Sequence, residues 1–581
     1  MRILLVTAVL ATAVWFVAAT PVTAPELYDV KQLKNGMVLD GESVFDQEGL
    51  KPFKATVLAV MPDFLAPGED LILVRLSGEI VDRYGVVNGM SGSPLYFKGK
   101  LVGAVSYRFG ALPKEPIAGV TPAESMLALL KERKERPKKL AAAGPPRTVA
   151  GFGEVQPIAA PLVCGGCTDE ALAEFAPKLA ALGFAPVRGS GSASNTRFPM
   201  FAGGPVGSSL VEGDVSMSAL GTITYINGND VVAFGHPSNS TGDAEVPMAT
   251  AEIFSTIPSL SGGHKLGRSG AIIGAWTDDR LPAIGGRMGL TARTVPFKVT
   301  INRPGDLDAK KDLAFNVVDD TGMGAALTDV AVASAIMGRT GAESIGTVTL
   351  KGAVTLLDGT IIPIEEKFSS VPARNPVNAA ASMVGDIMES LWRNAFERVR
   401  FKDVQLTVTQ DLESHIGMVV KTVIQQPRIH AGETIKLRID VRTHREGLKQ
   451  LNVELPTDAT MEPGYYWVAV ADELEAMDID REAAMVTYPR NIKDLIKQLQ
   501  KKKRGDRLYV YLLDKVKGAR VDGQPMAELP PSMQAILNDG MEGGPVRKLT
   551  KRSLKMVTLD PGVMVLGEAE TQVHIAPARG K

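Results

Sequence analysis

Gly89-Met90-Ser91-Gly92-Ser93-Pro94 is the stretch that decides the fold of this chain, because it presents a serine in a turn of small residues. Two β-rich segments joined at Lys98-Gly99-Lys100 follow at once, within residues 95–107. Glycines let the backbone bend sharply, so the amides of Gly89 and Ser91 are expected to point at one oxygen. A serine hydroxyl needs a neighbouring base to become a good nucleophile, and the turn therefore predicts a histidine elsewhere.

His236 is the histidine that fits this requirement. A strand-like pattern begins at Gly221, turns at Asn227-Gly228 and returns through Val231, and His236 follows it directly. Asn-Gly between two β-rich runs is a strong hairpin signal. We expect a histidine at this place, between glycine and proline, to be exposed at the end of a barrel strand.

Together the two segments resemble the SpoIVB family of serine peptidases, which act in sporulation signalling. In that family a Gly-His motif supplies the general base and a Gly-Met-Ser-Gly-Ser-Pro motif supplies the nucleophile. The resemblance covers roughly the first half of the chain and extends upstream through two expected strands, residues 53–61 and 70–76. It implies a trypsin-like double β-barrel in which Ser91 attacks, His236 takes the proton, and the amides of Gly89 and Ser91 form the oxyanion hole.

The order of the two segments is reversed relative to the family, since here the serine comes first. A permuted chain rebuilds the same contacts when its ends lie close together. The linker that such a permutation needs is visible as a Pro-, Lys- and Ala-rich stretch at residues 136–146. We therefore expect a circularly permuted barrel.

The acidic member of the family's triad has no obvious counterpart, because the matching position is Ser77 or Gly78. Its role is to orient the histidine and stabilise its charged form, and its loss costs about 10⁴ in rate without removing all catalysis. Asp82, Asp70 and Asp243 are the candidate replacements, with Asp82 taken first. A catalytically degenerate barrel that serves as a cell-envelope binding or scaffold protein is the alternative function.

Each motif also has an ordinary structural explanation. Glycine, serine and proline dominate turns in general, and a single histidine near a strand end is more often structural than catalytic. Ser93 is the second serine of the turn, but the trypsin-like pattern places the attacking serine at Ser91. An esterase would use the same nucleophile, yet the chain lacks the Gly-x-Ser-x-Gly elbow here.

Composition and charge limit the classes of function that this chain can have. A chain of 581 residues is long enough for several domains, and its abundant glycine and proline with few aromatic residues suit a β-rich protein. Acidic and basic residues balance at 65 to 64, which argues against a general nucleic-acid or membrane-surface role. No cofactor or metal is expected.

The N-terminus predicts export. Arg2 precedes an apolar run at residues 3–17, and small residues follow, so we expect a signal peptide over residues 1–19 with cleavage after Ala19, or alternatively after Ala24. The mature protein would then be periplasmic or extracellular. No later segment is apolar enough to span a bilayer.

The two cysteines, Cys164 and Cys167, lie in a Cys-Gly-Gly-Cys sequence. A zinc site would need a further pair of ligands, and a redox site would need a thioredoxin-like context, neither of which is seen. In an oxidising compartment we expect a local disulfide that staples a loop.

The organisation expected along the chain combines mainly β domains with α+β parts. Helices are expected from residue 123 to about 135, and at 169–182, 325–337 and 379–399; a hairpin is expected at 347–357. The predicted divisions are a serine-bearing half-barrel (20–136), a linker (137–150), a histidine-bearing half-barrel (151–290), an α+β region (291–412), an immunoglobulin-like β-sandwich (413–475) and a C-terminal α/β extension (476–581).

The sequence thus predicts an exported serine endopeptidase. Its substrate would be a polypeptide, with the protein itself as one candidate because the sporulation members of the family process themselves.

Overall fold

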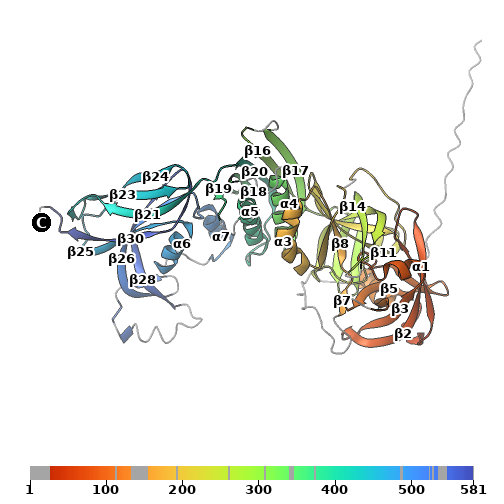
Figure 1. Cartoon of the computed structure of the whole chain (residues 1–581). Coiled ribbons are helices and arrows are strands. Elements are labelled where there is room, and N and C mark those ends of the chain that lie inside the picture. Colours follow the sequence, from red (N-terminus) through yellow and green to blue (C-terminus); the bar gives the residue numbers. More distant parts are fainter. Residues whose placement is uncertain are drawn as a thin grey trace, which may run out of the picture.

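A computed structural model of the chain describes most of its length (Figure 1). The described residues are 26–110, 114–132, 155–191, 194–259, 262–305, 309–338, 346–371, 375–483, 489–521, 524–526, 529–530, 532–533 and 546–579. The expected signal peptide and the expected linker at 137–150 lie outside them. The described part is mainly β, and its N-terminal and C-terminal sheets lie at opposite ends of the molecule.

The first sheet contains the serine motif. Its strand order is β4-β1-β2-β3-β6-β5-β7, with a further pairing of β4 to β5. The bounds are β1 Val38–Val44, β2 Leu50–Ala66, β3 Glu69–Ser77, β4 Pro94–Phe97, β5 Lys100–Phe109, β6 Ile117–Pro122 and β7 Val155–Pro157. Two helices accompany it, α1 (Glu79–Tyr84) and α2 (Ala123–Glu132). Strand β7 shows that this sheet continues past the expected boundary at residue 136.

The second sheet contains the histidine motif and, among the described residues, has 13 strands. Their order is β19-β18-β20-β16-β17-β10-β13-β14-β15-β12-β11-β8-β9. The bounds of the strands nearest the site are β8 Ala160–Gly165, β9 Phe184–Arg188, β10 Pro205–Gly213, β11 Ser216–Asn227, β12 Asp230–Ala233, β13 Gly242–Ile257, β14 His264–Arg280 and β15 Ala283–Met288. As predicted, β11 and β12 pair across Asn227-Gly228.

The expected boundary at residue 290 does not separate two sheets. Strands β16 (Thr294–Asn302), β17 (Lys310–Val318), β18 (Thr347–Leu356), β19 (Ile361–Ser369) and β20 (Phe401–Asp411) belong to the same sheet as the histidine strands. Strand β10 makes the connection, because it pairs with β17 through Val211–Val317 as well as with β11 and β13. The division at 290 is therefore wrong at the level of strand pairing.

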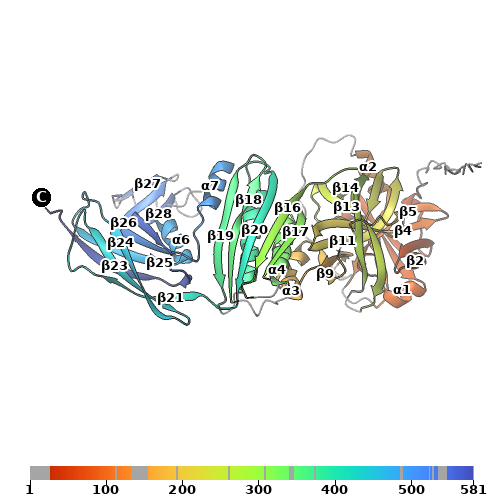
Figure 2. The same ribbon diagram turned by 90° about the horizontal axis from the view of Figure 1, so that it is seen from above.

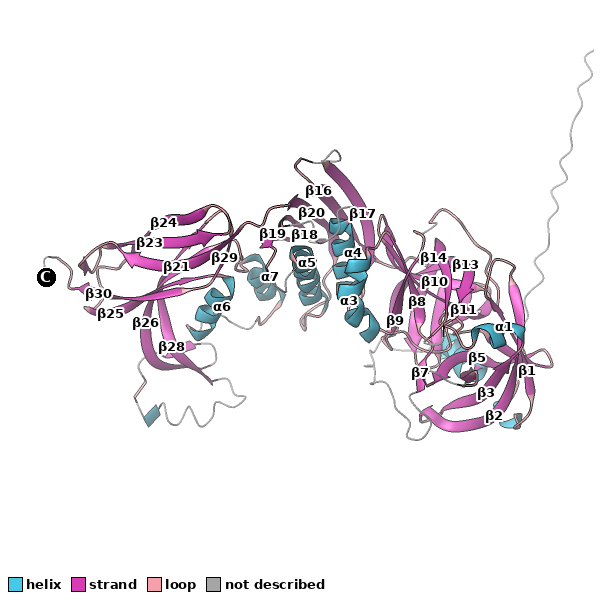
Figure 3. Cartoon of the chain, in the orientation of Figure 1, coloured by secondary structure: helices cyan, strands magenta, loops and turns pink. Residues whose placement is uncertain are grey.

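Three helices lie side by side next to this sheet (Figure 3). They are α3 (Asp169–Ala181), α4 (Gly324–Met337) and α5 (Pro376–Trp392). Helices α4 and α5 lie against the β16–β20 part of the sheet, and α3 packs on α4 and β9. The middle helix, α4, is apolar on all sides and almost entirely buried, as expected of a helix enclosed by neighbours. Together with α2, these correspond to the four helices expected from the sequence.

Two local expectations need correction. In place of the hairpin expected at 347–357, the single strand β18 (Thr347–Leu356) pairs with β19 and β20, and the turn follows it, at 357–359. Gly352 lies within this strand and allows close approach of the neighbouring strand, since a Cβ built there would lie 2.0 Å from the Gln405 carbonyl oxygen. Helix α5 ends at Trp392 rather than residue 399, because the Asn394 side chain donates to the Leu391 carbonyl at 2.7 Å and closes the last turn.

The C-terminal part has two sheets around a common apolar core (Figure 2). One has the order β24-β23-β21-β29, and the other β22-β30-β25-β26-β27 with β28 paired to β26. Their bounds are β21 Ile416–Ile424, β22 Ile429–His430, β23 Thr434–Thr443, β24 Gly447–Pro456, β25 Gly464–Ala471, β26 Leu508–Val521, β27 Gln524–Met526, β28 Val546–Leu559, β29 Met564–Leu566 and β30 Ala569–Ala576; helices α6 (Glu473–Glu482) and α7 (Ile492–Gln500) lie between β25 and β26 in the chain.

The expected division at residue 475 is also wrong. Strand β21 pairs with β29, and β25 pairs with β26 and β30. Residues 413–475 therefore do not complete their sheets without the segment that follows. The sequence does not show this because the pairing partners lie between about 40 and about 150 residues away in the chain, beyond the reach of local alternation patterns.

Candidate active site

The serine turn, residues 89–94, lies between α1 and β4 and depends on its two glycines. Gly89 has φ +88° and Gly92 has φ +94°, a region in which residues with a Cβ are strained. The amide of Gly92 donates to the Val105 carbonyl at 2.7 Å, and the amide of Ser93 donates to the Met90 carbonyl at 3.1 Å. The motif thus forms the tight turn that its glycines predict.

The serine turn is attached to β11 of the second sheet. The backbone N–H of Thr222 donates to the Ser91 carbonyl at 2.9 Å, and its hydroxyl donates to the Gly89 carbonyl at 2.9 Å. The hydroxyl of Thr224 donates to the Gly92 carbonyl at 2.8 Å. Residues separated by more than 130 positions are therefore joined directly, and the turn lies where the two sheets meet.

His236 follows the end of β12 on a bent backbone. Phe234 and Gly235 have φ +67° and +72°, and the Gly235 carbonyl accepts the hydroxyl of Thr121 in the first sheet at 2.6 Å. A Cβ built at Gly92 would lie 2.6 Å from the Phe234 nitrogen. The residues flanking Ser91 therefore contact the segment that ends in His236.

The His236 ring is buried, contrary to the expected exposure, since only 4% of the residue is exposed. This burial lowers its pKa and so favours the neutral form that a general base requires, while hydrogen bonds to the backbone of Pro237 and Ile158 oppose the shift. Nδ1 lies 2.8 Å from the Pro237 carbonyl oxygen. A carbonyl can only accept, so Nδ1 carries the hydrogen and Nε2 carries the lone pair.

Ser91 Oγ and His236 Nε2 are not hydrogen-bonded to each other. Both atoms are buried, and neither has a hydrogen-bond partner among the described residues. Ser91 is fully enclosed, whereas His236 lines a cavity. The nucleophile and base predicted from the sequence thus lie on adjoining segments, with both reactive atoms unpartnered.

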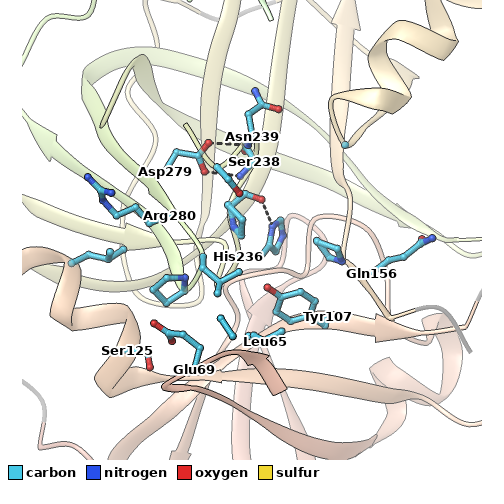
Figure 4. A pocket seen from close by; sticks show the side chains of 18 of the residues that line it. Leu65, Glu69, Tyr107, Ser125, Gln156, His236, Ser238, Asn239, Asp279 and Arg280 are labelled. Atoms are coloured by element: carbon cyan, nitrogen blue, oxygen red, sulfur yellow. Dashed lines mark hydrogen bonds between the residues drawn. The ribbon is translucent and has the colours of Figure 1, made fainter. Parts of the chain in front are cut away.

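The cavity beside His236 has a volume of about 1450 Å³ and lies between the two sheets (Figure 4). Its lining includes Leu65, Tyr107 and Glu69 from the first sheet and Asp279 and Arg280 from the second. Burial raises the pKa of Glu69. The site can admit a chain of several residues alongside the histidine, and Ser91 does not contribute to its lining.

None of the three expected acids orients His236. Asp82 is exposed on α1, Asp70 accepts the backbone N–H of Asp63 at 3.0 Å, and Asp243 pairs with Arg280 at 2.7 Å. Nδ1 of the His236 ring instead donates its hydrogen to the Pro237 carbonyl oxygen. These acids are therefore not triad members in this arrangement, and a backbone carbonyl takes the orienting position.

The acid that sequence reasoning missed is Asp279, at the end of β14. It is 5% exposed and accepts the backbone N–H groups of Ser238 at 2.7 Å and Asn239 at 2.8 Å. Burial raises its pKa, and these hydrogen bonds oppose that rise. It holds the loop after His236 rather than the ring. In the sequence, the signal for this acid was the Asp278-Asp279 pair at a strand end. The role of Asp279 becomes clear only in the structure, where it lies opposite Gly242 on β13.

The expected oxyanion hole is incomplete in this conformation. The amide of Gly89 donates to the Ala159 carbonyl at 3.3 Å, so it is already occupied. The amide of Ser91 makes no hydrogen bond to a described residue. Only one of the two expected donors is therefore available.

Cys164 and Cys167 are free buried thiols in the structure, and the expected disulfide is not formed. Cys164 is the penultimate residue of β8, and Cys167 follows a turn at Gly166, which has φ +72°. The hydrogen bond to Cys167, together with burial, raises the pKa of Cys164. The turn keeps the two cysteines close together. Because the raised pKa keeps Cys164 protonated, the pair has low reactivity as thiols.

Across the part of the chain that the structure describes, no three His, Cys, Asp or Glu side chains gather as a metal site would require. No helix within the same residues is long and apolar enough to cross a membrane. Comparisons of the chain with models of known families, with curated proteins and with solved structures find no match.

Proposed function

We propose that the protein is an exported serine endopeptidase with Ser91 as nucleophile and His236 as general base. The observation that carries the proposal is that Ser91 Oγ and His236 Nε2 are both buried and unpartnered, on segments that contact each other. Buried polar atoms are rarely left unsatisfied without a reason, and a catalytic role is one such reason. The sequence resemblance to the SpoIVB family points the same way.

In the proposed reaction, Nε2 takes the Ser91 hydroxyl proton as Oγ bonds to a peptide carbonyl carbon. The same proton then passes to the leaving amine, and water repeats the sequence to release the acyl group. The Ser91 amide would hold the oxyanion. A movement that brings Oγ within hydrogen-bond distance of Nε2 must come first, as catalytic hydrogen bonds often tighten only when substrate binds.

The fold that this proposal implies is a permuted, trypsin-like pair of barrels, followed by an immunoglobulin-like pair of sheets. The two halves contribute one catalytic residue each and meet at the Thr222–Ser91 and Thr121–Gly235 hydrogen bonds. The substrate would be a polypeptide lying in the cavity beside His236, with this chain itself as one candidate. Export to the periplasm or the exterior is part of the same proposal.

A fluorophosphonate probe tests the mechanism, because it reacts only with an activated serine. We expect labelling of the folded protein to map to Ser91 and not to Ser93. Ser91→Ala should abolish labelling and His236→Gln should slow it by at least about 100-fold. Ser390→Ala, at a half-buried serine of α5, is the matched control and should label at the wild-type rate. A folded wild-type protein that does not label, or labelling that persists in Ser91→Ala, would overturn the proposal.

The second candidate is a degenerate peptidase fold that binds polypeptide without cleaving it. Complete enclosure of Ser91, together with the occupied Gly89 amide, favours this function. Binding of a peptide library to the wild type and to Ser91→Ala with equal affinity, without probe labelling of either, would support it.

A further inference from the structure

Lys265 is a buried lysine next to the serine turn, and the proposed mechanism does not use it. It is the second residue of β14, and only 1% of it is exposed. Its backbone N–H donates to the Asn88 carbonyl at 3.0 Å. A Cβ built at Gly89 would lie 3.4 Å from the Lys265 Cβ. The lysine therefore packs against the start of the serine turn.

One hydrogen-bonded arm runs from its amine to the end of the turn. Lys265 Nζ donates to Ser43 Oγ at 2.8 Å, and Ser43 Oγ lies 2.8 Å from Ser93 Oγ. The Ser93 hydroxyl also lies 2.6 Å from the Met90 carbonyl oxygen. A hydroxyl has a single hydrogen; when Ser93 gives its hydrogen to the carbonyl, Ser43 donates to Ser93.

A second arm runs from the same amine to the start of the turn. Lys265 Nζ donates to Thr222 Oγ1 at 3.0 Å, and the Thr222 hydroxyl donates to the Gly89 carbonyl at 2.9 Å. Ser43 lies on β1 of the first sheet and Thr222 on β11 of the second. The amine therefore connects both sheets to both ends of the serine turn.

The surroundings of the amine suit its neutral form. Its contacts from β1 and β11 are uncharged hydroxyls, and no carboxylate among the described residues pairs with it. The Phe45 ring, whose centroid lies 5.2 Å away, is a neighbour that favours the charged form instead. A neutral amine has two hydrogens, and the two arms use both. Burial lowers the pKa of Lys265 to about 7. Protonation adds a third hydrogen, and no third hydrogen-bond acceptor for the amine is found among the described residues.

We infer that Lys265 is a positioning residue that fixes both ends of the serine turn through Ser43 and Thr222, and so holds Ser91 against the strands that lead to His236. The catalytic meaning of this role rests on the proposed function. The holding of the turn does not, because it follows from the contacts alone.

Amide hydrogen exchange of the full-length protein tests the inference without any need for activity. Peptic peptides covering residues 86–96 are followed by mass spectrometry between about pH 7 and about pH 9, and exchange is expressed as protection factors. Opening the turn to water lets Lys265 take up a proton, so higher pH favours the closed turn. We expect protection to rise by up to about 10-fold per pH unit in the wild type.

Lys265→Met should remove this rise and lower protection in the same peptides. Lys298→Met, at an exposed lysine of β16, is the matched control and should retain the wild-type profile. Because Lys265→Met places a new side chain in the core, Ser43→Ala and Thr222→Val test each arm separately. Each should lower protection of the turn by at least about threefold, in line with the loss of one hydrogen bond. Wild-type protection in both variants, or an unchanged pH profile in Lys265→Met, would overturn the inference.

Probe labelling separates this inference from the proposed function. If the wild type does not label but the exchange results hold, the peptidase proposal fails and the role of Lys265 in holding the turn stands. If Ser91 labels, and all three variants label at the wild-type rate with the wild-type pH profile, the positioning role fails and the peptidase proposal stands.

Discussion

Asp279 Oδ1 accepts the backbone N–H of Ser238 at 2.7 Å. The other carboxylate oxygen accepts the amide of Asn239 at 2.8 Å and that of Thr241 at 3.4 Å. A single buried side chain thereby determines the path of the loop that follows His236. The Pro237 carbonyl, which orients the histidine ring, is the first group of that loop.

Asp279→Asn should destabilise the protein, because its side-chain NH₂ would face backbone donors. We expect a loss of about 1–3 kcal/mol in the free energy of unfolding, measured by urea denaturation. Asp243→Asn is the control; the Asp243 side chain that pairs with Arg280 is 47% exposed, and the expected change is under about 1 kcal/mol. Equal effects of the two substitutions would show that the loop does not depend on Asp279.

Gly92→Ala should be far more damaging than Gly99→Ala. Both glycines have positive φ, at +94° and +76°, so both substitutions strain the backbone by about 1 kcal/mol. Only at Gly92 does the new Cβ meet backbone, 2.0 Å from the Thr222 carbonyl oxygen; at Gly99 it meets open space. We expect Gly92→Ala to cost at least about 2 kcal/mol more, measured by thermal unfolding. Similar melting temperatures would contradict the docking of the serine turn on β11.

Stability should rise with pH above neutrality because of Lys265. The folded protein loses this proton at about pH 7, whereas an unfolded lysine keeps it to about pH 10.4. Between these values the unfolded chain binds more protons, so raising the pH favours the folded state by at most about 1.4 kcal/mol per unit. Below about pH 7 the contribution is constant.

The measurement for Lys265 is the difference in unfolding free energy between the wild type and Lys265→Met. Taking the difference cancels the other groups that titrate over the same range. The difference should grow in favour of the wild type as the pH rises. A difference independent of pH would mean that the lysine is already charged in the folded protein.

Cys164 and Cys167 should react slowly with iodoacetamide in the native protein and quickly after denaturation. Both thiols are buried, and their mutual hydrogen bond with burial keeps Cys164 protonated, whereas alkylation requires the thiolate. Mass spectrometry should show both alkylated in denaturant without prior reduction. If alkylation in denaturant required a reductant, the pair would be a disulfide in the isolated protein.

Local structure was largely predictable from the sequence. The β4–β5 hairpin, the Asn227-Gly228 turn and helices α3 and α4 all depend on short-range signals such as glycine turns and apolar periodicity. The predictions were wrong where segments distant in the sequence determine how the strands pair. The sheet that runs through residue 290 and the pairing of β21 with β29 follow from tertiary contacts that no window of neighbouring residues contains.

The candidate site was predictable only in part, for the same reason. Ser91 and His236 could be singled out by their flanking glycines. Asp279 and Lys265 could not, because their importance comes from groups they meet across the fold. A lysine in an alternating strand is ordinarily assigned to the solvent side, and only the enclosed hydroxyls of Ser43 and Thr222 explain its burial.

The attachment of the serine turn to β11 and β14 has a consequence for how the protein is made. At about 5–20 residues per second, synthesis reaches Lys265 on the order of ten to thirty seconds after Ser91 has been added. For most of that interval the nascent N-terminal segment lacks Thr222, and until its end it lacks Lys265, so the turn has no complete set of partners. The serine turn therefore cannot dock on the second sheet until that sheet's strands have been translated.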